Sequence, residues 1–153
     1  MRRIKVGDVF EIVTPKGKAY FQFVFDNKQI CELIRVLPGI YSEQPSDMIK
    51  LVAMKELYFV HFPLKAAFNR QIVEFIDNFV ILKELELPPK YMRVDYSDIS
   101  GKRGWHIVRY NSWQRQFVQE LTQEQMKLSS WETWNDTMLI KRIIDGWSLD
   151  QWV

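Results

Sequence analysis

The feature that most constrains the fold is an alternation of apolar and polar side chains over residues 8–25, interrupted by Thr14-Pro15-Lys16-Gly17. Pro15 presets the backbone angle φ at the second turn position, and Gly17 tolerates a positive φ where the chain re-enters a strand. After the turn, Phe21, Phe23 and Phe25 recur at every second position, which places three rings on one face of a strand. The stretch therefore predicts a β-hairpin whose aromatic face is the floor of the core.

Further strands and short helices are predicted downstream. Strand patterns cover 29–37, 57–62, 71–76, 91–94, 105–110 and 113–119. The first of these is apolar on both faces and should lie in the interior of a sheet. Short helices are expected over 64–69 after Pro63, and over 123–128, where Thr122 and Gln125 form a capping box. Residues 47–55 fit a helix capped by Ser46 or a strand, and the sequence does not define the structure of 40–56 or 77–104.

The strongest helical pattern lies near the end of the chain. Asn135 is a good N-cap for a helix over 136–145, and Gly146 is a good C-terminal stop. Leu139 and Ile143 repeat at helical spacing, so this helix should pack on the sheet. We therefore predict a single α+β domain over residues 1–153. It would contain a bent antiparallel sheet, begun by the N-terminal hairpin, with the C-terminal helices packed on it.

Charge and tryptophan are unevenly distributed along the chain. The net charge is only +2, with 18 Lys and Arg against 13 Asp and Glu in residues 1–118, but 3 against 6 in residues 119–153. All six tryptophans follow residue 104. The sequence thus has a mildly basic first part and an acidic, tryptophan-rich last third, which suggests two structural regions within one domain.

No group of residues dictates a chemistry. The two histidines, His61 and His106, fit better as packed or half-exposed side chains than as a catalytic base or ligand. Asp95 and Asp98 near His106 have no spacing typical of a zinc or hard-metal site. Cys31 lies in an apolar run and is expected to be a buried, inert thiol. We therefore expect a protein that is not an enzyme, with no metal and no cofactor.

One stretch leaves a nucleic-acid function open. Residues 99–119 contain no acidic residue and interleave cationic with aromatic side chains: Lys102, Arg103, Arg109 and Arg115 with Trp105, Tyr110 and Trp113. Such a hairpin could follow a nucleic-acid backbone and stack bases. The alternative is that the rings face the core and the cations are solvated. Four charges are few, and the pI of 8.6 is low for a nucleic-acid module, so the second interpretation is favoured.

The tryptophans near the last helix are candidates for a protein interface. Trp131 and Trp134 are three residues apart, which would put them on one face of a helical turn, and Trp152 also lies outside the amphipathic pattern. An exposed tryptophan is commonly explained by an interface, and Glu132 and Asp136 would supply charge at its rim. These five residues are the predicted partner-binding site. The alternative is that the tryptophans pack in the core.

The sequence resembles the immunity protein 26 family of bacterial polymorphic toxin systems. The resemblance rests on Lys5–Ile12 with Tyr20, on Leu121–Leu128, and on Trp134–Asp136 followed by Leu139–Ile143 and Gly146-Trp147. These segments span both ends of the chain, whereas residues 40–104 do not match well. None of the matching motifs is catalytic; they are patterns of strand, cap and helix stop.

Membership of such a family would imply an antidote that binds a cognate toxin and blocks it stoichiometrically, without turnover. The toxin's activity and the oligomeric state are not indicated. A cytoplasmic location is expected, because there is one cysteine, no signal-peptide pattern and no apolar run long enough to span a membrane. The partner is thus expected to be a toxin protein, and neither a membrane nor nucleic acid.

Overall fold

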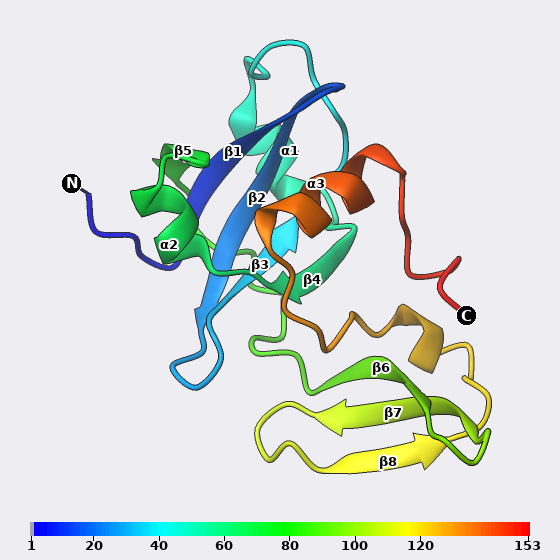
Figure 1. Cartoon of the computed structure of the whole chain (residues 1–153). Coiled ribbons are helices and arrows are strands. Elements are labelled where there is room, and N and C mark those ends of the chain that lie inside the picture. The colour runs from blue at the N-terminus through cyan, green and yellow to red at the C-terminus, as the bar shows by residue number, and fades with distance from the viewer. Residues whose placement is uncertain (1) are drawn as a thin grey trace.

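The computed structural model describes residues 2–153, which form an α+β fold with two antiparallel sheets (Figure 1). The strands are β1 (Asp8–Thr14), β2 (Gly17–Asp26), β3 (Glu32–Val36), β4 (Tyr58–His61), β5 (Val73–Asn78), β6 (Tyr91–Ser97), β7 (Arg103–Arg109) and β8 (Arg115–Val118). The helices are α1 (Met48–Ala53), α2 (Leu64–Asn69), the 3-10 turn η1 (Gln125–Lys127) and α3 (Asp136–Ile144). The strands form a five-stranded sheet, in the order β4-β3-β2-β1-β5, and a three-stranded sheet, β6-β7-β8.

The predicted hairpin forms the middle of the five-stranded sheet. Phe10 pairs with Phe21 across β1 and β2, and both side chains are fully buried. Their face is covered by α2 and α3, because Leu64 and Leu139 from these helices belong to the same apolar cluster. α1 covers the opposite face with Met48, Leu51 and Val52. The sheet is therefore buried on both faces, and β3 lies inside it as its doubly apolar sequence predicts.

A bulge in β2 overturns one part of the hairpin prediction. Phe23 pairs with Ile34 and Phe25 with Leu33, so Val24 is the extra residue between two consecutive partners. Phe21 and Phe23 face the main core as predicted. Phe25 does not join them. It is half-buried and packs instead in the cluster that includes Met92 and Tyr110 of the second sheet region.

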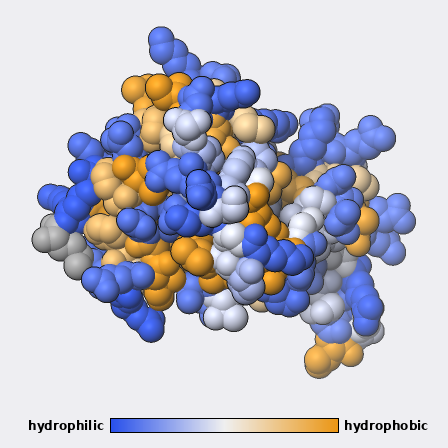
Figure 2. Space-filling model, turned by 90° about the horizontal axis from the view of Figure 1, so that it is seen from above, coloured by the Kyte–Doolittle hydropathy of each residue, from blue (hydrophilic) through white to orange (hydrophobic). Residues whose placement is uncertain are grey.

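The three-stranded sheet is longer and more separate than the sequence indicates. β6 continues to Ser97, three residues beyond the predicted strand 91–94, and β7 starts at Arg103, two residues before the predicted strand 105–110. Residues 110–114 connect β7 to β8, so the predicted strands 105–110 and 113–119 are both shorter at the loop: β7 ends at Arg109 and β8 begins at Arg115. The strands that were expected to form one bent sheet form two, which Figure 1 shows as a larger and a smaller lobe. Seen from above, the surface mixes hydrophilic with hydrophobic side chains (Figure 2).

One extended segment, Ser129–Trp134, joins the facing edges of the two sheets. Its Ser129 carbonyl accepts a hydrogen bond from the Arg93 amide of β6, and its Ser129 hydroxyl accepts one from the Phe59 amide of β4. The Trp131 amide donates to the Arg93 carbonyl, and the Trp134 amide donates to the His61 carbonyl of β4. We call Ser129–Trp134 the junction segment. It gives both edge strands a backbone partner.

The predicted helix caps are largely confirmed. The Asn135 side chain accepts a hydrogen bond from the Met138 amide, and Gly146 has the positive φ of a helix stop. Thr122 and Gln125 exchange side-chain and backbone hydrogen bonds of 2.9 and 3.1 Å, as in a capping box. The undecided segment is helix α1, capped by Asp47 rather than Ser46. No helix among residues 2–153 has the length and apolarity to cross a membrane.

Candidate partner-binding site

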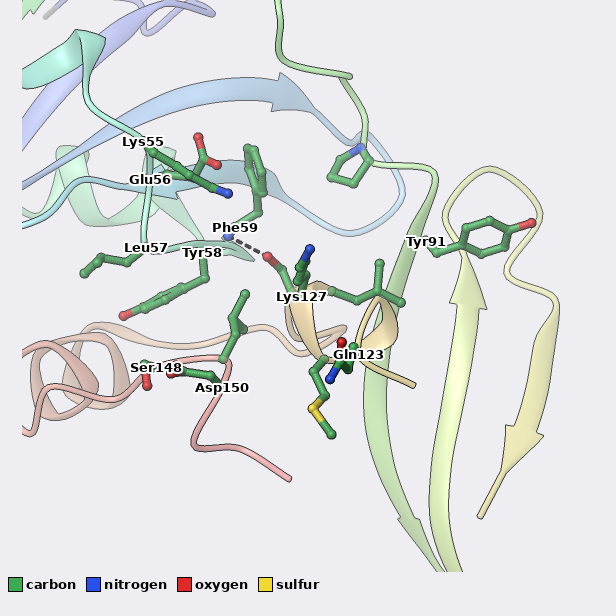
Figure 3. A pocket seen from close by; sticks show the side chains of 15 residues that line it. Lys55, Glu56, Leu57, Tyr58, Phe59, Tyr91, Gln123, Lys127, Ser148 and Asp150 are labelled. Carbon is green, nitrogen blue, oxygen red and sulfur yellow. Dashed lines mark hydrogen bonds between the residues drawn. The ribbon is translucent and has the colours of Figure 1, made fainter. Parts of the chain in front are cut away.

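A pocket of about 620 Å³ lies where the two sheets meet. One wall is formed by Leu57, Tyr58 and Phe59 at the start of β4, and the other by Gln123 and Met126–Ser129 around η1 (Figure 3). Ser148–Asp150 from the end of the chain also line the pocket, together with Lys55, Glu56, Pro89 and Tyr91. The Phe59 amide donates a 2.9 Å hydrogen bond to the Ser129 hydroxyl, which ties the two walls together.

The pocket combines an apolar lining with a mixed, charged rim. Leu57 is 44% exposed and Tyr91 37% exposed, so both present apolar surface to solvent at the pocket. Lys55, Lys127 and Asp150 are also exposed and carry opposite charges. Eight of the fifteen lining residues come from residues 119–153, the acidic third in which the interface was predicted. The pocket thus lies partly in the predicted region, but its lining contains none of the five predicted residues.

Arg93 of β6 fixes the end of the chain beside this pocket. Its side chain is fully buried and donates hydrogen bonds to four backbone carbonyls: those of Met126, Leu128, Leu149 and Trp152. Its guanidinium also lies over the rings of Trp105 and Trp152, 4.9 and 4.4 Å from their centroids. Burial lowers the pKa of Arg93 to about 10, so the group remains charged at neutral pH. The residue therefore holds η1 and the C-terminal residues against the smaller sheet.

Trp134 is a core residue, and its prediction as an exposed anchor is wrong. It is 3% exposed and packs edge-on to Tyr58 and Trp147, at centroid distances of 5.4 and 5.2 Å. The Arg142 guanidinium covers the same ring. The junction segment is extended rather than helical, so Trp131 and Trp134 enter different apolar clusters and do not share a face.

The other predicted site residues are half-buried. Trp152 packs against Trp105 and Trp147 and stacks with Arg93, so it holds the chain end in place. Glu132 accepts a 2.7 Å hydrogen bond from the Ser130 hydroxyl, and Asp136 lies in the first turn of α3. These contacts are structural, but they leave part of each side chain accessible.

Trp113, which was assigned to the basic hairpin, is the exposed tryptophan. It is 45% exposed, whereas the other five, all within the described residues, are half-buried or buried. Its ring lies 6.1 Å from that of Trp131, at an interplanar angle of 70°. Trp131 in turn contacts the rings of His61 and Tyr110 edge-on. The structure thus places Trp131, one of the predicted site residues, in contact with Trp113, which was not predicted to belong to the site.

The potential catalytic groups do not form a nucleophile and base. His61 is 1% exposed, and burial lowers its pKa to about 4. Burial also raises the pKa of the half-buried Cys31 thiol to about 11. Both groups are therefore neutral at pH 7, and His61 contacts Tyr110 rather than an acid or a thiol.

Asp95, Asp98 and His106 are not brought together as a ligand set. Asp95 pairs with Trp105 in the register of β6 and β7, so its side chain lies on the sheet face opposite to that of His106. Asp98 turns back on its own loop and accepts hydrogen bonds from Ser100 and Lys102. Within residues 2–153 no group of three His, Cys, Asp or Glu side chains is arranged to hold a metal ion.

Comparison of the chain with models of protein families, with curated proteins and with solved structures gives no match.

Proposed function

We propose that this protein neutralises a cognate toxin by binding it stoichiometrically and covering its functional surface, without turnover. The observation that carries the proposal is the backbone of Trp113. Its φ is +63°, in the left-handed region that a bulky residue rarely adopts. A large apolar side chain that is both exposed and held in a costly conformation is better explained by binding than by folding.

The local structure at Trp113 favours glycine. The Trp113 amide donates to the Arg109 carbonyl at 2.8 Å, and the Arg109 amide donates to the Gln114 carbonyl at 2.9 Å. These bonds close the loop between β7 and β8, in which Trp113 is the residue with left-handed backbone. In hairpin loops of this kind glycine is the common residue, because it has no Cβ to clash. Tryptophan here has a backbone cost that glycine would not have.

The ring is placed as an interface anchor would be. The Trp113 ring packs against the ring of Trp131, which itself contacts His61 and Tyr110. These contacts restrict the two tryptophan side chains before binding, which lowers the entropy cost of binding. Tryptophans in such positions are the residues that most often dominate the energy of a protein interface. The proposed interface is therefore centred on Trp113 and Trp131, of which Trp131 belongs to the predicted site.

The choice of a toxin as partner is supported by the sequence resemblance. Its matching segments form ordered elements: residues 5–12 include most of β1, residues 121–128 hold the capping box and η1, and residues 135–146 hold α3 with both of its caps. These elements build the frame that surrounds the junction segment. Residues 40–104, which do not match well, contribute the pocket wall at Leu57–Phe59.

The test begins with the reading frame upstream of this chain's own gene, which should end in a toxin-like domain that can be purified as the partner. Calorimetric titration should give one chain per toxin, and toxin activity should fall in proportion to occupancy. Trp113→Gly should weaken binding by about 30-fold or more, which corresponds to about 2 kcal/mol at a hot spot. The control is Val80→Gly, which removes another apolar side chain that is 86% exposed.

Failure of the wild-type chain to bind and inhibit that toxin domain would overturn the proposed function. If Trp113→Gly and Val80→Gly bind the toxin domain equally tightly, Trp113 is not the anchor. The pocket between β4 and η1 would then be the next candidate for the interface.

A further inference from the structure

Three aromatic rings lie together on the open face of the smaller sheet, one from each strand. The ring of His106 on β7 is 4.5 Å from Tyr96 on β6 and 6.3 Å from Phe117 on β8, and Tyr96 and Phe117 are 5.6 Å apart. His106 pairs with Val94 and Phe117 in the strand register, so its side chain points to the same face as theirs. All three rings are half-buried. We call Tyr96, His106 and Phe117 the ring triad.

The ring triad is held in place before any ligand arrives. Gly104 lies directly beneath Phe117, since a Cβ at this glycine would come within 2.8 Å of the Phe117 ring. The Tyr96 hydroxyl donates a 3.0 Å hydrogen bond to Asp98. Burial and the charges of Arg115 and Lys102 lower the pKa of His106, so its ring is uncharged at neutral pH. The rings therefore present a fixed, largely neutral platform for stacking.

Two exposed cations flank the platform. The Lys102 ammonium lies 4.0 Å from the centroid of the Phe117 ring, and an Arg115 guanidinium nitrogen lies 3.3 Å from His106 Nδ1. Neither cation has a carboxylate partner among the salt bridges of the described residues. The Asp98 carboxylate, which accepts a hydrogen bond from Tyr96, is an anion beside the platform, and two cations against this one anion still favour an anionic ligand over a cationic one. An acidic peptide would neutralise the two cations, but its carboxylate side chains would cover much less of the three rings than stacked bases would.

We propose that the ring triad, with Lys102 and Arg115, binds single-stranded nucleic acid by stacking unpaired bases and pairing with their phosphates. The proposal does not depend on the toxin-binding function. It also revises the favoured interpretation of 99–119, in which the rings face the core and the cations are only solvated. Trp105 and Tyr110 do pack inside. The rings on the open face come instead from Tyr96 and Phe117, which were not among the aromatic residues singled out in the sequence.

The structure offers a matched pair of charge reversals for the test. Lys102→Glu with Arg115→Glu changes the two cations at the ring triad. Arg103→Glu with Arg109→Glu makes the same charge change on exposed residues of the same hairpin, but their positions in β7 are on the opposite face from His106. Binding of a fluorescently labelled ten-nucleotide oligothymidylate is measured by anisotropy as a function of salt. Unlabelled duplex of the same length and polyglutamate serve as competitors.

The expected result is saturable binding that weakens with salt, with a slope of log K on log salt of about −1.4 for two phosphates. The Lys102/Arg115 variant should lose at least tenfold in affinity and flatten this slope, and the Arg103/Arg109 variant should lose less than threefold. Phe117→Leu, which keeps an apolar side chain but no ring, should also lose affinity. No binding by the wild type, equal losses in the two charge variants, or equal competition by duplex or polyglutamate would each overturn the proposal.

Discussion

His61 Nε2 and Tyr110 Oη lie 2.7 Å apart, and this contact links β4 of the larger sheet to the end of β7 in the smaller one. Asn27 Nδ2 also donates to Tyr110 Oη, at 3.0 Å. Because the hydroxyl oxygen is the acceptor for Asn27, its proton is available to the imidazole nitrogen. Burial lowers the pKa of His61 to about 4, so the ring is neutral at pH 7 and Nε2 can accept this proton.

This arrangement makes stability depend on pH through His61. Its pKa is about 4 in the folded protein and about 6.5 when unfolded, because burial disfavours the charged ring. Between these values the unfolded chain binds the proton more readily, so stability is full above pH 6.5 and falls as pH drops toward 4. The expected loss between pH 7 and pH 5 is about 2 kcal/mol, measured by urea unfolding. His61→Gln should lower stability at pH 7 but flatten this dependence. His106→Gln should flatten it less, because the pKa of His106 is also lowered but its ring is only half-buried. An unchanged slope in His61→Gln would contradict the assignment.

Arg93→Lys should destabilise the protein by about 2 kcal/mol or more, although it keeps the charge. Lysine has three donors on one atom and cannot reach four carbonyls spread over η1 and the chain end, so buried acceptors lose their partners. Urea melts measure the loss. Arg103→Lys, at an exposed position of β7, is the control and should change stability by less than about 0.5 kcal/mol. Similar behaviour of the two variants would show that the carbonyl contacts contribute little.

Phe23→Ala should cost about 3–5 kcal/mol, because this ring is 3% exposed in the main core and its removal leaves a cavity. Phe25→Ala should cost clearly less, since the bulge at Val24 places that ring in a half-buried position at the edge of another cluster. Denaturant melts of both variants test the order. A loss below about 1 kcal/mol for Phe23→Ala would mean that the assigned face of β2 is wrong.

Trp113→Gly should leave the free energy of unfolding unchanged to within about 1 kcal/mol. Glycine relieves the left-handed strain, and this gain offsets the removal of the ring that packs on Trp131. Thermal and urea melts of the isolated protein measure it. Trp134→Ala is the contrast, because a buried ring should cost about 3–5 kcal/mol when removed. A loss above 2 kcal/mol for Trp113→Gly would show that its ring serves the fold rather than a partner.

The elements that the sequence predicts well are those determined by local chemistry. The turn at Pro15 and Gly17, the Asn135 cap and the Thr122–Gln125 capping box depend on neighbouring residues, and each occurs in the structure. The α+β class follows from these same elements. The bulge at Val24 could not be predicted. The sequence of β2 alternates in the same way whether or not Val24 has a partner, and the bulge appears only when β2 is paired with β3.

The site was harder to predict, because exposure is a property of the assembled fold. Trp131 and Trp134 have the same local context, yet one meets Tyr110 and the other meets Tyr58, more than fifty residues apart along the chain. The junction segment could not be recognised either, since Ser129–Trp134 has no strand pattern and gains its extended form from two distant edges. A signal did exist at Trp113, because this bulky residue directly follows Asn111-Ser112, two residues that are common in turns.

The junction segment also has a consequence for the order in which the chain becomes complete during synthesis. β4 and β6 both precede it, so each facing edge is made before the residues that cover it leave the ribosome. Until then the amide of Phe59 and both backbone groups of Arg93 have only water, or another chain, as partners. Unpaired strand edges of this kind are where nascent and partly folded proteins associate wrongly. Truncation before Ser129 would therefore yield a chain that has every strand of both sheets and is nevertheless prone to aggregate.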